Sequence, residues 1–178
     1  METRGPLPTM RCVQVRESEL GDADAIAHVQ VETWRAAYRG IVPDMYLDDM
    51  DVIERAERWR QRSTEHRSTW VAECDSKVVG FVAFGACRDD DVSSAVGELH
   101  AIYVLPDRWR RGVGRALHDR CVAELGGRGF DEATLWALDA NPGAKAFYDA
   151  LGWEADGATV PHDFAGTEMI LVRYRRSL

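Results

Sequence analysis

Residues 98–117 (ELHAIYVLPDRWRRGVGRAL) read as a strand, a short turn and a helix that starts at two closely spaced glycines. Residues 98–104 alternate as in a β-strand, and Pro106, which has no N–H for a sheet ladder, ends it. Apolar residues then recur every fourth position, the spacing of one helix face. We expect the rest of the chain to be built around this stretch. The strand's two alternating sets are Leu99, Ala101 and Tyr103 on one side and His100, Ile102 and Val104 on the other. The helical stripe is Val113, Leu117, Cys121 and Leu125.

The glycines at 112 and 114 give this turn the properties of an anion site. The first four N–H groups of a helix have no partner within it, and the helix dipole favours negative charge there. Three arginines, at 110, 111 and 115, add positive charge. The pattern predicts a bound phosphate or pyrophosphate, with a plain tight turn as the alternative. The turn does not match a Walker loop, because no Lys-Ser/Thr pair follows the glycines. It does not match a dinucleotide-binding fingerprint either, because Leu117 occupies the position that requires a small residue.

The turn resembles the acetyl-CoA signature of the GNAT superfamily of N-acetyltransferases, a Gln/Arg-x-x-Gly-x-Gly/Ala turn between a strand and a helix. Trp109 occupies the first position of the signature, where the family has Gln or Arg. The resemblance implies that the turn binds the pyrophosphate of acetyl-CoA, mainly through backbone N–H groups. The residues concerned are Arg110, Arg111, Gly112, Val113, Gly114 and Arg115.

A second stretch resembles the same family more specifically. Asn141 is followed seven residues later by Tyr148 and then by Leu-Gly-Trp at 151–153. The resemblance implies that the Asn141 side chain contacts the pantetheine or phosphate arm of acetyl-CoA and that the Tyr148 hydroxyl lies near the thioester sulfur. The structural alternatives are a helix N-cap for Asn141 and a half-buried helix residue for Tyr148.

The elements predicted along the chain follow the order β-α-α-β-β-β-α-β-α-β-β. This order predicts a single α/β domain with a mixed, mostly antiparallel sheet flanked by helices, and it matches the GNAT order over nearly the whole chain. We expect residues 1–9 to be a flexible leader and 10–178 the domain, with Met10 a candidate start. The predicted helices are 22–38, 44–62, 113–126 and 142–151. The predicted strands are 13–15, 69–73, 78–85, 98–104, 133–138, 153–156 and 167–175.

Composition excludes several classes of partner. The net charge of −8 and a pI near 5.1 argue against nucleic acid. No apolar run reaches the ~20 residues of a membrane span, and the N-terminus does not resemble a signal peptide. The four cysteines are scattered, which predicts neither a zinc site nor a disulfide framework and favours the cytoplasm. We expect no metal cofactor.

The resemblance implies acetyl transfer by direct attack of an amine on the thioester. Backbone N–H groups of Ile102, Tyr103 and Val104 would hold the acetyl group and the developing oxyanion. Tyr148 would protonate the leaving thiolate. The candidate base is Glu98 or His100, acting through a water relay, and the alternative is that Glu98 only hydrogen-bonds within the sheet. No covalent acyl-enzyme is expected, because Cys87 and Cys121 lack a histidine partner.

The acceptor stays open between a small molecule and a peptide amine. Trp34 and Tyr38, four apart on one helix face, are candidate lining of its pocket, with core packing as the alternative. Met45, Tyr46 and a loop holding Pro161, His162 and Asp163 are expected to join them. The charged run 88–91 is expected to be a solvated loop tip. The last strand could pair across a homodimer, and a non-catalytic acyl-CoA-binding or regulatory module is the alternative function.

Overall fold

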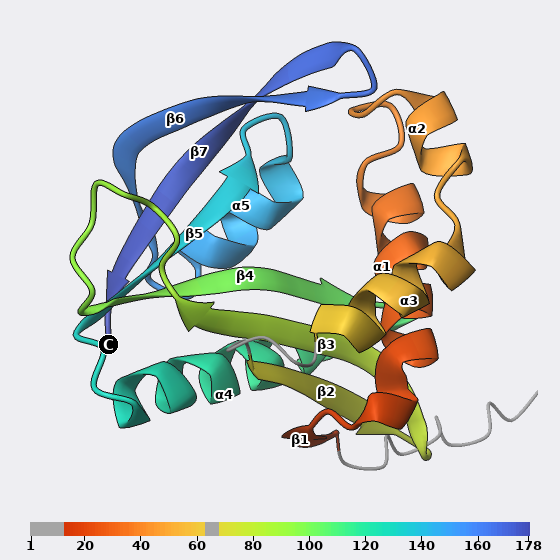
Figure 1. The fold of residues 1–178 in the computed structure, drawn as a ribbon, viewed down its shortest axis with the longest axis horizontal. Helices are drawn as coiled ribbons and strands as arrows, with labels where there is room; N and C mark the ends of the chain where they lie inside the picture. Colours follow the sequence, from red (N-terminus) through yellow and green to blue (C-terminus); the bar gives the residue numbers. More distant parts are fainter. Residues whose placement is uncertain (1–12, 63–67) are drawn as a thin grey trace, which may run out of the picture.

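The computed structural model describes residues 13–62 and 68–178 as one seven-stranded sheet with helices on both faces (Figure 1). The predicted leader and Met10 lie outside the described residues. The strand order is β1-β2-β3-β4-β5-β7-β6. The strands are β1 (Gln14–Glu17), β2 (Ser68–Cys74), β3 (Lys77–Ala86), β4 (Val96–Val104), β5 (Glu132–Leu138), β6 (Glu154–Phe164) and β7 (Thr167–Ser177). The α-helices are α1 (Ala23–Ala37), α2 (Asp44–Asp48), α3 (Val52–Arg62), α4 (Val113–Gly127) and α5 (Pro142–Asp149); the 3-10 turns are η1 (Leu20–Asp22) and η2 (Pro106–Arg108).

The core lies on both faces of the sheet. On one face, α4 and α5 cover the central strands, and the predicted α4 stripe from Val113 to Leu125 is fully buried there. On the other face, Ile26 and Val29 of α1 pack against Phe81 of β3, with α3 alongside α1. None of the helices in the described part of the chain is long and apolar enough to cross a membrane.

All strand pairs are antiparallel except β4 with β5, so the predicted mixed, mostly antiparallel sheet is confirmed. The parallel pair is short: Val96–Glu98 lies opposite Glu132–Thr134, and no further residues pair. Figure 1 shows the two strands diverging beyond this point. The last strand, β7, lies between β5 and β6. The expectation that it pairs across a dimer is therefore wrong, since both of its edges are already occupied.

The simple alternation predicted for residues 98–104 is interrupted at His100. In the β3–β4 register, Ala83 lies opposite Ala101 and Phe84 opposite Leu99, so His100 is an extra, bulged residue. The bulge turns Leu99 into the core beneath α4, whereas Ala101 and Tyr103 face α1. The prediction that Leu99 shares a face with Ala101 and Tyr103 is therefore wrong, because one inserted residue shifts the period.

Two other predicted boundaries need correction. The segment with Pro161 and His162 is not a loop but part of β6, whose residues pair with β7 as far as Phe164. Proline is tolerated there because β6 is the edge strand and needs no second ladder. The single helix predicted over 44–62 is divided into α2 and α3, where the Asp51 carboxylate accepts the N–H groups of Ile53 and Glu54 at 2.6 and 3.1 Å.

A buried histidine joins α4 to the start of β6. His118 Nε2 accepts a hydrogen bond from the Trp153 indole at 2.9 Å, and Nδ1 lies 3.0 Å from the Asp119 carboxylate. The ring is almost fully buried, and this burial lowers the pKa of His118 below its usual value. His118 is therefore neutral at pH 7, with its Nδ1 proton directed to Asp119.

Replacing His118 with Phe leaves the buried Trp153 N–H without an acceptor, which costs about 1–3 kcal/mol of the free energy of unfolding at pH 7.5. Because the pKa of His118 is lowered on folding, the unfolded chain binds its proton more readily below pH ~6.5, and the wild type loses stability there. The difference between wild type and variant should therefore shrink from pH 7.5 to pH 5.5 in urea titrations. A His118→Phe effect that is constant with pH would contradict this account.

Candidate active site

The glycine turn before α4 is shaped as an anion site. Gly112 stands at the N-cap with φ = +84°, in the left-handed region that favours glycine. The first hydrogen bond of the helix runs from the Ala116 N–H to the Gly112 carbonyl at 3.0 Å. The N–H groups of residues 113–115 therefore have no acceptor within the helix. The side chains of Arg110, Arg111 and Arg115 are all exposed around the turn.

One backbone carbonyl anchors this turn to the rest of the site. Val104, at the end of β4, accepts hydrogen bonds on its carbonyl oxygen from the Trp109 indole at 2.6 Å and from the Thr33 hydroxyl at 3.0 Å. Trp109, the residue that departs from the family signature, thus ties the turn to the strand. A Cβ on Gly114 would lie 3.3 Å from the Phe147 ring, so this glycine lets α5 approach α4 closely.

The divergence of β4 from β5 leaves backbone groups of β4 without sheet partners. Beyond Glu98, β4 keeps its register with β3 but has no paired residue in β5. The predicted residues Ile102, Tyr103 and Val104 lie in this part of β4. The Leu105 N–H donates to the Val79 carbonyl of β3, so the Tyr103 N–H, two residues earlier, also faces β3. The N–H groups of Ile102 and Val104 therefore lie at the edge toward β5, available to hydrogen-bond a ligand.

Asn141 and Tyr148 flank this region from α5. The Asn141 side chain caps the helix, accepting the Ala144 N–H at 3.0 Å. The N-cap alternative for Asn141 is therefore confirmed. Tyr148 is buried against Trp153 and Tyr174. Burial, followed by the nearby Tyr38 hydroxyl, raises the pKa of Tyr148, which keeps it a neutral proton donor at pH 7.

Glu98 is buried at the point where β4 and β5 separate, and it is held by Arg88. Its Oε2 accepts the Arg88 backbone N–H at 3.1 Å and Nε at 3.0 Å, while Oε1 accepts Nη2. Nε2 of His100 lies 3.6 Å from the same Oε2, so the structure brings the two predicted base candidates together. The hydrogen bonds to Glu98 raise the pKa of Arg88.

The charged run 88–91 is mostly exposed, as its composition predicts, but its side chains also form ion pairs with other elements. Arg88 binds Glu98, and Asp89 and Asp91 both bind the buried guanidinium of Arg173 on β7, at 3.0 and 2.7 Å. Nε of Arg173 also donates to Asp156 of β6 at 2.7 Å. The run therefore connects the base candidates to the β6–β7 hairpin.

The predicted acceptor-pocket aromatics pack against one another. The centroid of the Trp34 ring lies 4.8 Å from that of Tyr38 and 6.0 Å from those of Tyr46 and Phe164. The centroids of the Phe164 and His162 rings are 4.6 Å apart. Met45 is 74% exposed and stands apart from this packing. These rings join α1 and α2 to the β6–β7 hairpin. They fill the space between these elements and form a border of the site, not a pocket.

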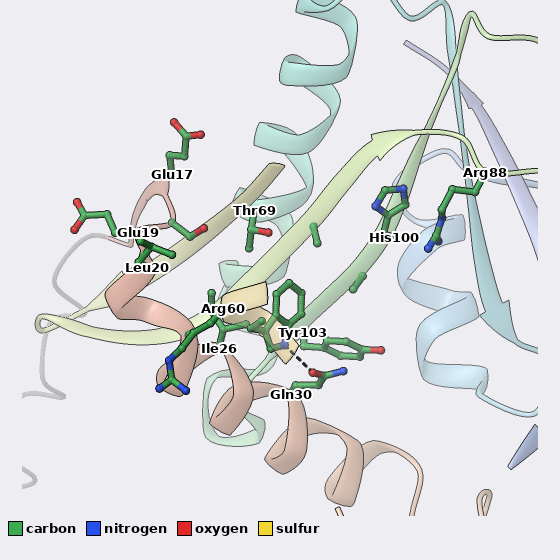
Figure 2. Close-up of a pocket in the computed structure, with 15 residues that line it drawn as sticks. Glu17, Glu19, Leu20, Ile26, Gln30, Arg60, Thr69, Arg88, His100 and Tyr103 are labelled. Carbon is green, nitrogen blue, oxygen red and sulfur yellow. Dashed lines mark hydrogen bonds between the residues drawn. The ribbon is translucent and has the colours of Figure 1, made fainter. Parts of the chain in front are cut away.

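A cleft of about 270 Å³ lies instead between α1, α3 and the sheet (Figure 2). His100, Ala101 and Tyr103 of β4 line it, and Arg88 lies at the His100 end. Ile26 and Gln30 of α1 and Trp59 of α3 form the facing wall, with a hydrogen bond of 2.9 Å from the Trp59 indole to Gln30. Sequence reasoning missed Arg88, Gln30 and Trp59, since only the folded chain brings them to one cavity.

Comparison with known proteins identifies the family. Residues 29–153 match the profile of the acetyltransferase (GNAT) family. The chain belongs to the GNAT family. This confirms the resemblance drawn from the glycine turn and the Asn141–Trp153 stretch, and it makes the protein an acyltransferase by family. The matched range spans α1 to the end of α5 and so includes all the site elements described above except the β6–β7 hairpin.

Curated relatives agree with this assignment. The chain is 37% identical over 143 residues to the uncharacterized N-acetyltransferase YuaI of Bacillus subtilis (strain 168), covering 80% of each chain. Two solved structures share the fold. A GCN5-related N-acetyltransferase from Rhodopseudomonas palustris superposes with a TM-score of 0.75 at 20% identity, covering 97% of this chain and 100% of that one. PaiA N-acetyltransferase from Thermoplasma acidophilum, in complex with coenzyme A, gives 0.72 at 19% identity, covering 94% and 100%.

Changing Arg173 to Met removes the cation of the partly buried Asp89 and the nearer of the two cations of Asp156, which keeps only Arg175 Nε at 3.6 Å. We expect a loss of at least about 2 kcal/mol in the free energy of unfolding at pH 7, measured by urea denaturation. The matched control is Arg175→Met, two residues along β7. Its side chain is more exposed, and its ion pair with Glu132 and longer 3.6 Å contact with Asp156 should together contribute under about 1 kcal/mol. Equal losses in the free energy of unfolding in the two variants would show that the buried Arg173 ion pairs stabilise the fold no more than the exposed ones of Arg175.

Proposed function

We propose that this protein transfers an acetyl group from acetyl-CoA to a primary amine by direct attack in a ternary complex. The observation that carries the proposal is the separation of β4 from β5 next to a glycine turn that opens α4. A fold neighbour, PaiA from Thermoplasma acidophilum, was solved with coenzyme A, which supports this ligand. The three cysteines in the described residues are free thiols, which supports a reducing, cytoplasmic setting.

Each part of the site has a role in this reaction. The N–H groups of Val113, Gly114 and Arg115 bind the pyrophosphate, with the exposed arginines nearby. The strand edge at 102–104 donates N–H groups to the pantetheine arm and to the thioester oxygen as negative charge develops on it. The Asn141 amide contacts the same arm while its oxygen caps α5.

The chemical step needs two proton movements. The amine nitrogen forms a bond to the thioester carbon and loses a proton, and the C–S bond breaks as the sulfur takes up a proton. Tyr148 supplies the second proton, since burial keeps its phenol protonated. Because Arg88 occupies three acceptor positions of Glu98, the amine proton leaves through a water held between Glu98 and His100 rather than by direct contact with a free carboxylate.

The first experiment measures thermal unfolding with acetyl-CoA, with CoA and with ATP as control. A rise in melting temperature with the CoA compounds and none with ATP is expected, because ligand binding to the folded state stabilises it. The stabilised protein is then assayed for thiol release with a panel of amines. An equal shift with ATP, or no shift with CoA, would overturn the proposal.

Tyr148→Phe separates catalysis from simple acyl-CoA binding. Loss of the proton donor should lower kcat about 10²-fold or more, while the acetyl-CoA affinity by calorimetry stays within about threefold. Tyr174→Phe, on a buried ring 6.0 Å from Tyr148, is the matched control and should keep its turnover. Unchanged turnover in Tyr148→Phe would show that Tyr148 is not the proton donor. Binding of acetyl-CoA without turnover in the wild type would favour a non-catalytic acyl-CoA-binding module.

A further inference from the structure

We propose that Arg88 recognises a carboxylate on the acceptor, so that the acceptor class is an amine bearing a nearby carboxylate, as in an α-amino acid. This inference rests on the proposed acetyl transfer. Arg88 lies in the loop between β3 and β4 and lines the cleft beside His100. It is also the residue that holds Glu98, so it adjoins the point where β4 separates from β5.

The Arg88 guanidinium is held in place with one edge still available. Nε and Nη2 donate to Glu98, whereas Nη1 makes no hydrogen bond to any described residue. The side chain is 51% exposed although its partner Glu98 is buried. A guanidinium with one edge fixed by a carboxylate and the other open is preorganised to bind a second carboxylate through two parallel hydrogen bonds.

The other arginine of the cleft is arranged differently. Arg60, on α3, donates through Nη2 to both carboxylate oxygens of Asp24 at 2.7 Å, at the α1–α3 end of the cavity. It lies at the opposite end from His100 in Figure 2. Arg88 is therefore the cation placed close to the proposed transfer point, and Arg60 offers a control in the same cavity.

The charges around Glu98 fit a zwitterion. Each carboxylate oxygen has two strong acceptor positions, and Oε1 of Glu98 uses one of them for Arg88. Glu98 itself is buried and does not line the cleft, so its remaining acceptor position is left for the water that takes the amine proton. An α-amino acid carries its ammonium two bonds from its carboxylate, so a carboxylate bound by the open N–H groups of Arg88 brings the ammonium close to this water. Because the protein has a net charge of −8, a carboxylate-bearing acceptor needs such a local cation to enter the cleft.

The rest of the cleft would receive the acceptor's side chain. Between the two arginines part of the wall is apolar, with Ala83 and Ala101 from the sheet facing Ile26 of α1, beside the polar side chains of Thr69 and Gln30. Trp59 and Tyr103 add aromatic surface, and Phe81 fills the space between their rings at 5.0 and 5.5 Å. Apolar side chains such as those of leucine or phenylalanine match these walls by the burial of apolar surface.

The test compares acceptors that differ only in the carboxylate. L-leucine is paired with 3-methylbutylamine, and L-phenylalanine with phenethylamine, and kcat/KM is measured by thiol release in wild type, Arg88→Met and Arg60→Met. The wild type and Arg60→Met should favour each amino acid over its decarboxylated partner by at least about tenfold. In Arg88→Met the ratio should fall to near one. A loss of kcat that arises through Glu98 affects both acceptors equally and cancels in this ratio. If Arg88 only positioned Glu98, the ratio would therefore be the same in Arg88→Met as in the wild type.

A binding measurement covers the case in which Arg88→Met turns over too slowly to assay. 4-Methylpentanoate, which has the carboxylate but no amine, should bind the acetyl-CoA-loaded wild type and lose at least tenfold in affinity in Arg88→Met, but not in Arg60→Met. A wild type that prefers the decarboxylated amines, or a preference that survives in Arg88→Met, would overturn the carboxylate proposal. Absence of thiol release with every amine would instead count against acetyl transfer itself.

Discussion

The site depends on one constraint: β4 and β5 pair over three residues and then separate. A sheet does not readily give up hydrogen bonds, since a buried, unpaired backbone group costs about 1–3 kcal/mol. Here β4 remains paired to β3 along its other edge, and the Val104 carbonyl is fixed by Thr33 and Trp109. The open edge is thus held rigidly by neighbouring elements, and it lies one short turn from the N-terminus of α4, the proposed pyrophosphate site.

Ion pairs surround the point where β4 and β5 separate. Arg88 holds Glu98 at the point of separation, and Arg173 gathers carboxylates from the β3–β4 loop and from β6. The β3–β4 loop therefore connects the candidate base to the β6–β7 hairpin through consecutive residues, 88 and 89.

The sequence predicted the parts of the site that are local in the chain. The glycine turn, the buried α4 stripe and the Asn141 cap each follow from spacing alone, and the GNAT family follows from two such motifs in order. The bulge at His100 was not predictable, because its register is set by β3. The ion pairs of the run 88–91 were not predictable, because its partners, Glu98 and Arg173, are distant in sequence or set by the fold. The sequence predicts too short a strand for β6, because Pro161 indicates a loop unless the strand is known to lie at the edge of the sheet.

The most direct measurement is backbone hydrogen exchange with and without acetyl-CoA, followed by mass spectrometry. The account predicts slower exchange in residues 100–104 and 112–115, where N–H groups without partners would bind the thioester arm and the pyrophosphate. ATP at the same concentration should give no protection at 100–104. Tight binding of acetyl-CoA that leaves both segments unchanged would contradict the account, because the opening between β4 and β5 would then not be the acetyl-CoA site.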